Sequence, residues 1–233
     1  MVHSNSKSIT EEAPPGARPS RILVWDLPTR VFHWLLVVLV VLAFVTAEIG
    51  GTAMPYHMWN GGAILVLVLF RVLWGFGGGT QSRFATFVRG PRKVVAYARS
   101  LFGKEHAPYL GHNPLGAWSI VAILTALAIQ VGTGLFANDD ILTEGPLFQW
   151  VSKGTSDWLT RIHLINQGIL IGLVALHIGA IAFYLVVKRE NLILPMITGR
   201  KQWHEAVDGA GGSPTKAFLL AAVLAVAVYW VIY

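Results

Sequence analysis

Four of the eight histidines in this sequence fall within long apolar stretches, at His33, His57, His163 and His177. An ionisable side chain is costly inside a lipid bilayer, so a histidine at that depth usually serves a function. Imidazole nitrogen is a common metal ligand. One such histidine is as easily a hydrogen-bonding group between helices, whereas four in matching positions favour pairs of cofactor ligands.

The spacing of these histidines predicts which of them meet. His163 and His177 are 14 residues apart, so on one helix they differ by only about 40° in direction and lie about 21 Å apart along the axis. If successive helices alternate in direction, depth pairs His33 with His177 and His57 with His163. A haem iron held by two histidines has both axial positions filled, which suits electron transfer.

Other metal chemistry fits this sequence less well. Zinc usually takes three or four ligands in one cluster, whereas these histidines divide into two distant pairs. The sequence contains no cysteine, which excludes iron–sulfur clusters and the covalent attachment of c-type haem.

The elements that position the histidines are membrane helices. Hydrophobic residues make up 54% of the 233 residues and charged residues only 13%, against about a quarter charged in soluble domains. A span needs roughly 20 apolar residues, and five stretches qualify, at about 31–47, 57–76, 114–137, 159–187 and 217–233. The predicted fold is all-α, an integral membrane four-helix bundle plus a fifth C-terminal transmembrane helix.

The distribution of charge predicts the topology. Lys and Arg gather before the first span, between the second and third, and after the fourth, while acidic residues dominate the other connections. The positive-inside rule then places the N-terminus in the cytoplasm and the C-terminus outside. The formal charge of +6 follows from these flanks, so we expect contact with membrane lipid and no nucleic-acid partner.

Three segments are expected along the chain. Residues 1–21 are polar and lack the apolar core of a signal peptide, which predicts a disordered cytoplasmic lead. Residues 22–208 form the four-helix domain that holds the haems. Residues 209–233 comprise a glycine-rich flexible linker at 209–214, which sets the last helix apart, and that helix itself.

Three further polar residues have two interpretations each. Arg71, near the cytoplasmic end of the second span, either pairs with a haem propionate or extends to the lipid headgroups, and Arg30 carries the same ambiguity. His112 either passes protons to a quinone near the inner haem or is a solvated loop residue. Small residues at 61, 62, 132, 134, 168 and 172 let helices approach closely and also leave room for a flat ring.

Several motifs resemble those of one family. Residues 24–34 (Val-Trp-Asp-Leu-Pro-Thr-Arg-Val-Phe-His-Trp), 70–75 (Phe-Arg-Val-Leu-Trp-Gly) and 111–116 (Gly-His-Asn-Pro-Leu-Gly) are similar to signatures of bacterial cytochrome b561 proteins. That group includes the b-type cytochrome subunit of nickel–iron hydrogenases. The resemblance implies a four-helix bundle with two b haems on His33, His57, His163 and His177, exchanging electrons with quinone and a partner redox protein.

The predicted function is transmembrane electron transfer in the bacterial inner membrane. It would link the quinone pool to a periplasmic or membrane redox protein, such as a c-type cytochrome or a hydrogenase, and an electron-transfer subunit is favoured over a stand-alone enzyme. One alternative is a quinone-linked oxidoreductase such as a superoxide oxidase, although the acidic outer connections disfavour a small anionic substrate. Another is a haem-free transporter or structural subunit, but no matching pair of interrupted spans supports it.

Overall fold

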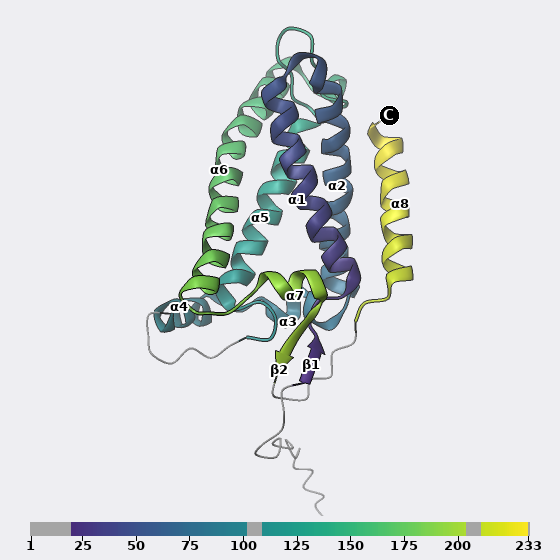
Figure 1. Ribbon diagram of the computed structural model, residues 1–233. Helices are drawn as coiled ribbons and strands as arrows, with labels where there is room; N and C mark the ends of the chain where they lie inside the picture. The colour runs from purple at the N-terminus through teal and green to yellow at the C-terminus, as the bar shows by residue number, and fades with distance from the viewer. Residues whose placement is uncertain (1–19, 102–108, 204–210, 233) are drawn as a thin grey trace, which may run out of the picture.

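The computed structural model describes residues 20–101, 109–203 and 211–232. Within these ranges five helices are long and apolar enough to cross a membrane, which confirms the predicted all-α membrane fold (Figure 1). They are α1 (Leu27–Ile49), α2 (Met54–Gly77), α5 (Pro114–Gly134), α6 (Lys153–Val186) and α8 (Pro214–Ile232).

Side-chain caps mark the starts of α1 and α5. Asp26 Oδ1 accepts a hydrogen bond from the Thr29 amide at 2.9 Å before α1, and Asn113 Oδ1 accepts one from the Gly116 amide at 2.8 Å before α5. A proline follows each cap in the first turn, where its missing N–H costs nothing. The third span begins at Pro114, where it was expected.

Most spans begin earlier than hydropathy predicted. α6 starts at Lys153, six residues before the expected 159, because Ser152 accepts a hydrogen bond from the Thr155 amide at 3.3 Å. The first turns of α6 are polar, so an apolar window does not include them. The third span is shorter than expected and ends at Gly134.

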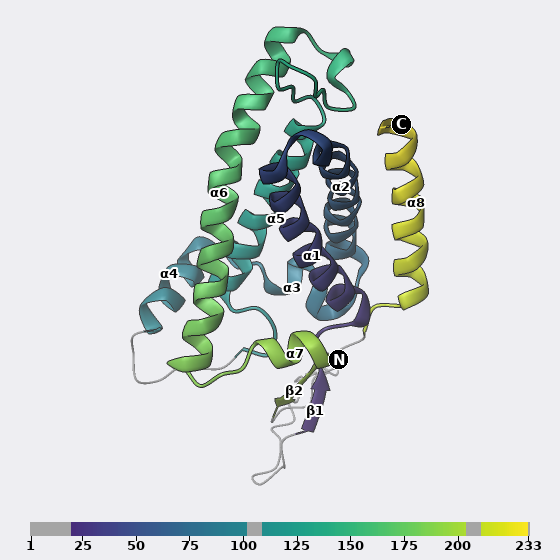
Figure 2. The ribbon, with the colours of Figure 1, turned by 45° about the horizontal axis from the view of Figure 1, so that its top comes forward.

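The four central helices form a bundle whose sequential neighbours pack together. α1 lies against α2, α2 against α5, and α5 against α6 (Figures 1 and 2). In a membrane such packing depends on close side-chain contact more than on exclusion of water. The core at the middle of the bundle comprises Ile64, Val68, Ala126, Leu127, Val131 and Leu170.

The fifth helix is attached to the bundle more firmly than predicted. α8 packs along α2, and its Ala217 belongs to a second core cluster with Phe32, Phe70, Trp74 and Leu124. Before it, the Gly212 amide donates to Asp26 Oδ2 at 3.0 Å, and a β-carbon on Gly212 would overlap the Trp74 ring. The expectation of a flexible linker is therefore wrong for its described part, residues 211–213; residues 209 and 210 lie outside the described residues.

A small sheet closes the end of the bundle at which α1 begins. β1 (Ser20–Leu23) pairs antiparallel with β2 (Arg200–Trp203), with Ser20 opposite Trp203. Ser20 and Arg21, which were expected in the disordered lead, belong to β1, and residues 1–19 lie outside the described residues.

Short helices surround this sheet. The turns and helices at this end are η2 (Thr80–Ser82), α3 (Phe84–Phe87), α4 (Pro91–Ser100) and α7 (Ile193–Thr198). The opposite end carries η1 (Gly51–Ala53) and η3 (Phe148–Trp150). We call the end with β1 and β2 the lower end and the opposite end the upper end, as they stand in Figure 1.

Candidate functional site

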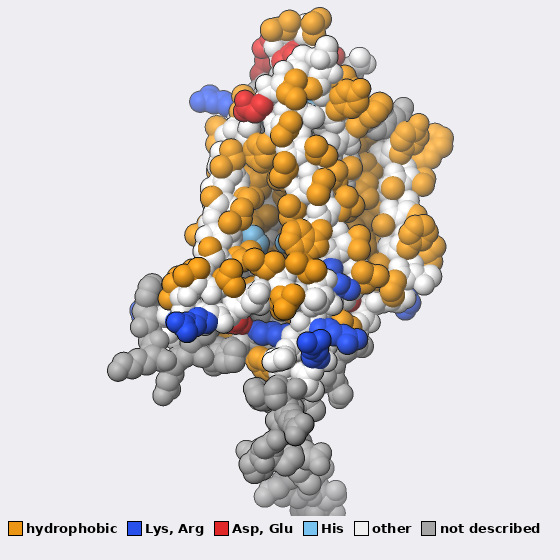
Figure 3. Space-filling view, in the orientation of Figure 1, with side chains coloured by type: hydrophobic (Ala, Val, Ile, Leu, Met, Phe, Trp, Pro, Cys, Tyr) orange, Lys and Arg blue, Asp and Glu red, His pale blue; other side chains and the backbone are white. Residues whose placement is uncertain are grey.

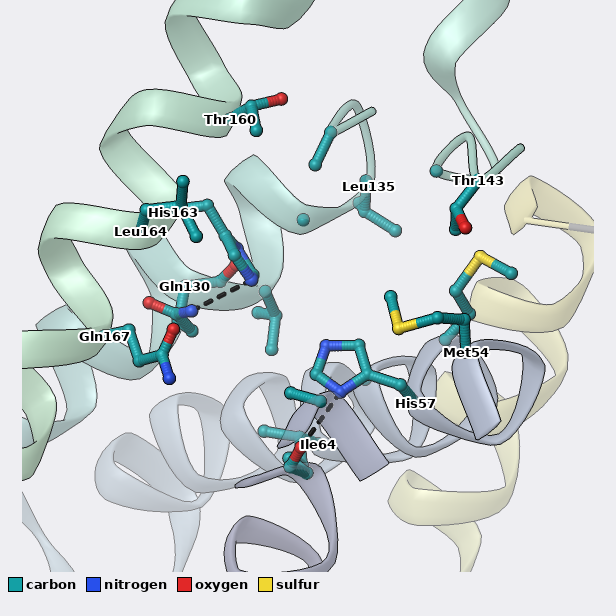
Figure 4. Close-up of a pocket in the computed structure, with 18 of the residues that line it drawn as sticks. Met54, His57, Ile64, Gln130, Leu135, Thr143, Thr160, His163, Leu164 and Gln167 are labelled. Atoms are coloured by element: carbon teal, nitrogen blue, oxygen red, sulfur yellow. Dashed lines mark hydrogen bonds between the residues drawn. The ribbon is translucent and has the colours of Figure 1, made fainter. Parts of the chain in front are cut away.

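The structure brings His57 and His163 together near the upper end of the bundle. His57 lies in the first turn of α2 and His163 ten residues into α6, and their ring centroids are 6.4 Å apart with the planes at 80°. Both imidazoles project into a cavity of about 410 Å³ between the helices (Figure 4). This volume falls within the range of ligand sites, about 300–1,000 Å³. We call this cavity the upper site.

Hydrogen bonds hold both rings by the same nitrogen. His57 Nδ1 lies 3.0 Å from the Ala43 carbonyl oxygen, and His163 Nδ1 lies 2.9 Å from the Gln130 carbonyl oxygen. A carbonyl can only accept, so each Nδ1 carries the proton and donates it. Each Nε2 then keeps its lone pair, which is the arrangement that metal-binding histidines show when a second group orients them.

The separation of the two rings fits a metal held between them. A metal–imidazole bond of about 2 Å on each side, together with the radius of each ring, places the centres of two imidazoles that share one metal roughly 6 Å apart. The observed 6.4 Å agrees with this value. Among the residues that the structure describes, no group of three or more His, Cys, Asp or Glu side chains converges on a metal position, so the pair suits a macrocycle that supplies the remaining ligands.

Small residues make room beside the rings, although fewer than the sequence suggested. Gly61, Gly62 and Gly134 line the cavity, and a β-carbon on Gly134 would lie 2.9 Å from His163 Cε1. By contrast, β-carbons on Gly132, Gly168 and Gly172 would meet nothing within 4 Å. None of these last three glycines is among the residues that line the cavity.

A second set of polar groups meets near the lower end, and we call it the lower site. It comprises His33 of α1, Arg71 of α2, His177 of α6 and His112, which precedes α5. Within the described chain, His33 Nδ1, Arg71 Nη1 and His112 Nδ1 are buried without a hydrogen-bond partner. Buried polar atoms are normally paired, so three unpaired atoms in one place fit a site for a polar or metal-containing group.

The hollow that leads to this site is visible on the molecular surface. Figure 3 shows histidine side chains deep between α6 and α1, above α7, on a face that is otherwise almost entirely apolar. His33 and His177 are the histidines of these two helices toward the lower end.

His112 is not the solvated loop histidine that one interpretation expected. Its ring lies between those of Trp25 and Phe87, with centroid distances of 4.5 and 4.6 Å. Burial lowers the pKa of His112 to about 3, and the nearby positive charge of Arg71 acts in the same direction. His112 is therefore neutral near pH 7.

The two arginines with ambiguous roles differ in their surroundings. Arg71 is only 3% exposed and its guanidinium lies 4.9 Å from the centroid of the Phe84 ring, so the interpretation that it extends to the headgroups is wrong. Its Nη1 is free to donate to a carboxylate inside the bundle. Arg30 instead donates from Nη1 to the Ile197 carbonyl oxygen at 2.6 Å and holds α7 in place.

The apolar core separates the upper and lower sites. Along α2, Ile64 and Val68 lie between His57 and Arg71; along α6, Leu170 lies between the two histidines. α5 contributes no histidine and forms a wall of the upper site. Sequence reasoning missed two polar residues near this site, Gln130 of α5 and Asn166 of α6. Each is an amide inside an apolar span and so carried a usable signal.

Known proteins share this sequence pattern. Residues 24–199 match the family described as prokaryotic cytochrome b561. A probable Ni/Fe-hydrogenase B-type cytochrome subunit of Bradyrhizobium diazoefficiens is 25% identical over 223 residues, covering 81% of this chain and 88% of the relative. A protein of the same name from Azotobacter chroococcum mcd 1 is 25% identical over 221 residues, covering 81% and 91%. No solved structure matches the chain.

Proposed function

Because this chain belongs to the prokaryotic cytochrome b561 family, we propose that it carries electrons across the bacterial inner membrane between the quinone pool and a redox protein at the periplasmic face. As a member it is a membrane b-type cytochrome, and its cofactor is haem b. Haem b supplies the one-electron chemistry of its iron. The number of haems, their ligands, the quinone and the partner belong to our proposal.

Two haems with two histidines each are the arrangement that we propose. His57 and His163 would hold one in the upper site, and His33 and His177 the other in the lower site. The observation that carries this proposal is the geometry of the upper pair, with rings 6.4 Å apart and both Nδ1 atoms tied to backbone carbonyls. In the lower site Arg71 would pair with a haem propionate, since its buried Nη1 has no other acceptor among the described residues.

The proposed orientation places the lower end in the cytoplasm. Figure 3 shows Lys and Arg side chains gathered around the lower end, whereas acidic side chains gather at the upper end. Cytoplasmic loops of membrane proteins carry such an excess of Lys and Arg. Electrons that pass between the two sites would therefore cross most of the bilayer.

A quinone would react at the lower site. Its reduction takes up protons together with electrons, and the lower end faces the proposed proton source. His112 supports this placement because its Nδ1 is buried and unpaired next to the proposed haem ligands. We propose that the neutral His112 forms a hydrogen bond with the bound quinone.

The partner at the upper end would be a redox protein with basic residues around its docking face. The upper loop exposes Asp139, Asp140 and Glu144, and opposite charges steer association. The names of the relatives point to a hydrogenase as one such partner; a c-type cytochrome is another. The same acidic loop would repel superoxide, so a superoxide oxidase has less support than an electron-transfer subunit.

Haem content measured on the purified protein tests this proposal. We expect reduced-minus-oxidised spectra of two low-spin b haems per chain. His57→Ala and His163→Ala should each remove the same haem, while His33→Ala and His177→Ala should remove the other. His112→Ala, which alters a histidine outside both pairs, should keep both haems. A chain without haem after expression with adequate haem supply would contradict the proposal, and so would losses that do not follow these pairs.

A further inference from the structure

A chain of side-chain amides leads from α5 and α6 to the imidazole of His163. Gln130 Nε2 lies 3.0 Å from His163 Nε2, and Asn166 Nδ2 lies 2.7 Å from Gln130 Oε1. We propose that Gln130 and Asn166 are positioning residues for the haem of the upper site, and that the Gln130 side chain points its N–H group toward this haem. This inference rests on the proposed function, since it concerns a haem held by His163.

The direction of each hydrogen bond in this series of amides follows from the end that a backbone carbonyl fixes. Asn166 Nδ2 lies 2.9 Å from the Ala126 carbonyl oxygen, which can only accept, so the Asn166 amide group must point its nitrogen there. The same nitrogen donates its second proton to Gln130 Oε1. The oxygen of Gln130 is therefore occupied, and its nitrogen is turned toward His163 Nε2.

The other end of the chain is equally determined. His163 Nδ1 donates to the Gln130 backbone carbonyl at 2.9 Å, which leaves the lone pair on His163 Nε2 to accept from the Gln130 amide. Gln130 thus contacts His163 with both its backbone and its side chain. Figure 4 shows the Gln130 side chain beside the His163 ring at the edge of the cavity.

The cost of these amides argues for a role. Asn166 is 5% exposed, and a buried amide is expensive unless each of its groups is paired. Amides in membrane helices often hold two helices together, and the Asn166 bond to Ala126 does that between α6 and α5. Holding α5 and α6 together does not require Gln130 to point its N–H group at His163, a proposed haem ligand in the cavity.

The consequence is electrostatic. Iron on His163 Nε2 would replace the hydrogen bond from Gln130, and the tie between Gln130 Oε1 and Asn166 would keep the N–H end on the cavity side. The positive end of that N–H dipole favours the reduced haem, which carries one electron more. Removal of the donor should therefore make the upper haem harder to reduce. We expect the ratio of reduced to oxidised haem at a given potential to fall tenfold, which lowers the midpoint potential by about 59 mV for one electron.

The experiment is a redox titration of the purified protein, followed by optical and electron paramagnetic resonance spectra. The wild-type chain is measured first. If it holds no haem, the proposed function is wrong. If it holds two haems, the role of Gln130 and Asn166 can be tested separately from the proposed function. Gln130→Leu should lower the midpoint potential of the upper haem and leave the lower haem unchanged. Asn166→Leu should reproduce the shift, and the double variant should show no more than either single variant.

Thr125→Val is the matched control, because Thr125 lies on α5 five residues before Gln130 but is exposed and bonds only the Val121 carbonyl among the described residues. An unchanged upper potential in Gln130→Leu, equal shifts of both haems, or additive shifts would overturn the inference. If Gln130→Leu loses the upper haem, Gln130→Met separates packing from hydrogen bonding, because methionine has about the length of the glutamine side chain but no N–H donor. Retention of the haem at lowered potential supports the inference, and loss of the haem overturns it because packing alone would then explain the residue.

Discussion

A β-carbon on Gly134 would lie 2.9 Å from Cε1 of His163 and 3.2 Å from its Nδ1. The His163 ring has little freedom to move away, because its Nδ1 donates to the Gln130 carbonyl and lies 3.3 Å from Thr133 Oγ1. We therefore predict that Gly134→Ala displaces His163 and lowers the affinity of the upper haem at least tenfold, about 1.4 kcal/mol.

The haem-to-protein ratio at limiting haem measures this effect. Gly132→Ala is the control, since a β-carbon at Gly132 meets nothing within 4 Å and should leave both haems in place. Equal haem affinity in the two variants would mean that Gly134 is not needed beside the ligand.

The buried charge of Arg71 leads to a prediction for the other site. Arg71 is 3% exposed and its Nη1 has no partner in the described chain. A buried cation stabilises an added electron on a nearby haem, so Arg71→Met should lower the potential of the lower haem by roughly 59 mV or more, a tenfold change in the reduced-to-oxidised ratio.

Redox titration of the Arg71→Met variant provides the measurement, with Arg92→Met as control because Arg92 is exposed on α4. The upper haem should keep its potential in both variants. A shift confined to the upper haem would place Arg71 outside the lower site.

The sequence predicted the features that depend on one helix at a time. The regular pitch of α6 relates His163 to His177, and depth then relates His163 to His57, whose rings the structure brings to 6.4 Å. The start of α5 at Pro114, after the Asn113 cap, is likewise local. Local rules such as these carry over to the folded chain because a membrane helix must satisfy its own backbone.

Features that join distant segments could not be predicted in this way. Ser20 pairs with Trp203 across nearly the whole sequence, and four-residue strands give too little alternation to be recognised. The contact of Gly212 with Asp26 depends on where α8 packs, which a glycine-rich stretch does not reveal. The amide chain of Gln130 and Asn166 required the relative rotation of α5 and α6, which hydropathy does not define.

The carboxylate of Asp26 connects four segments of the chain. Its Oδ1 caps α1, while its Oδ2 accepts from Trp74 Nε1 at 3.3 Å, from the Gly79 amide at 3.2 Å and from the Gly212 amide at 3.0 Å. Asp26→Ala leaves these buried donors without an acceptor, at about 1–3 kcal/mol for each donor. We predict a clear loss of thermal stability in detergent and easier proteolysis before α8.

Asp140→Ala serves as the control for this stability measurement, because Asp140 is an exposed acid. It should unfold at the wild-type temperature. Equal unfolding temperatures for wild type and Asp26→Ala would show that the contacts of Asp26 do not hold the lower end together.

The absence of cysteine from the sequence allows a direct test of the proposed topology. Leu142 is 92% exposed in the α5–α6 loop, and Arg92 is exposed on α4 at the opposite end. A membrane-impermeant maleimide should label Leu142→Cys in cells with a permeable outer membrane and an intact inner membrane, and Arg92→Cys only after the inner membrane is broken. The positive-inside rule predicts this result because Lys and Arg gather at the lower end. If Arg92→Cys alone is labelled before lysis, the topology is the opposite of the proposed one, and the proposed quinone site lies in the periplasmic half of the membrane.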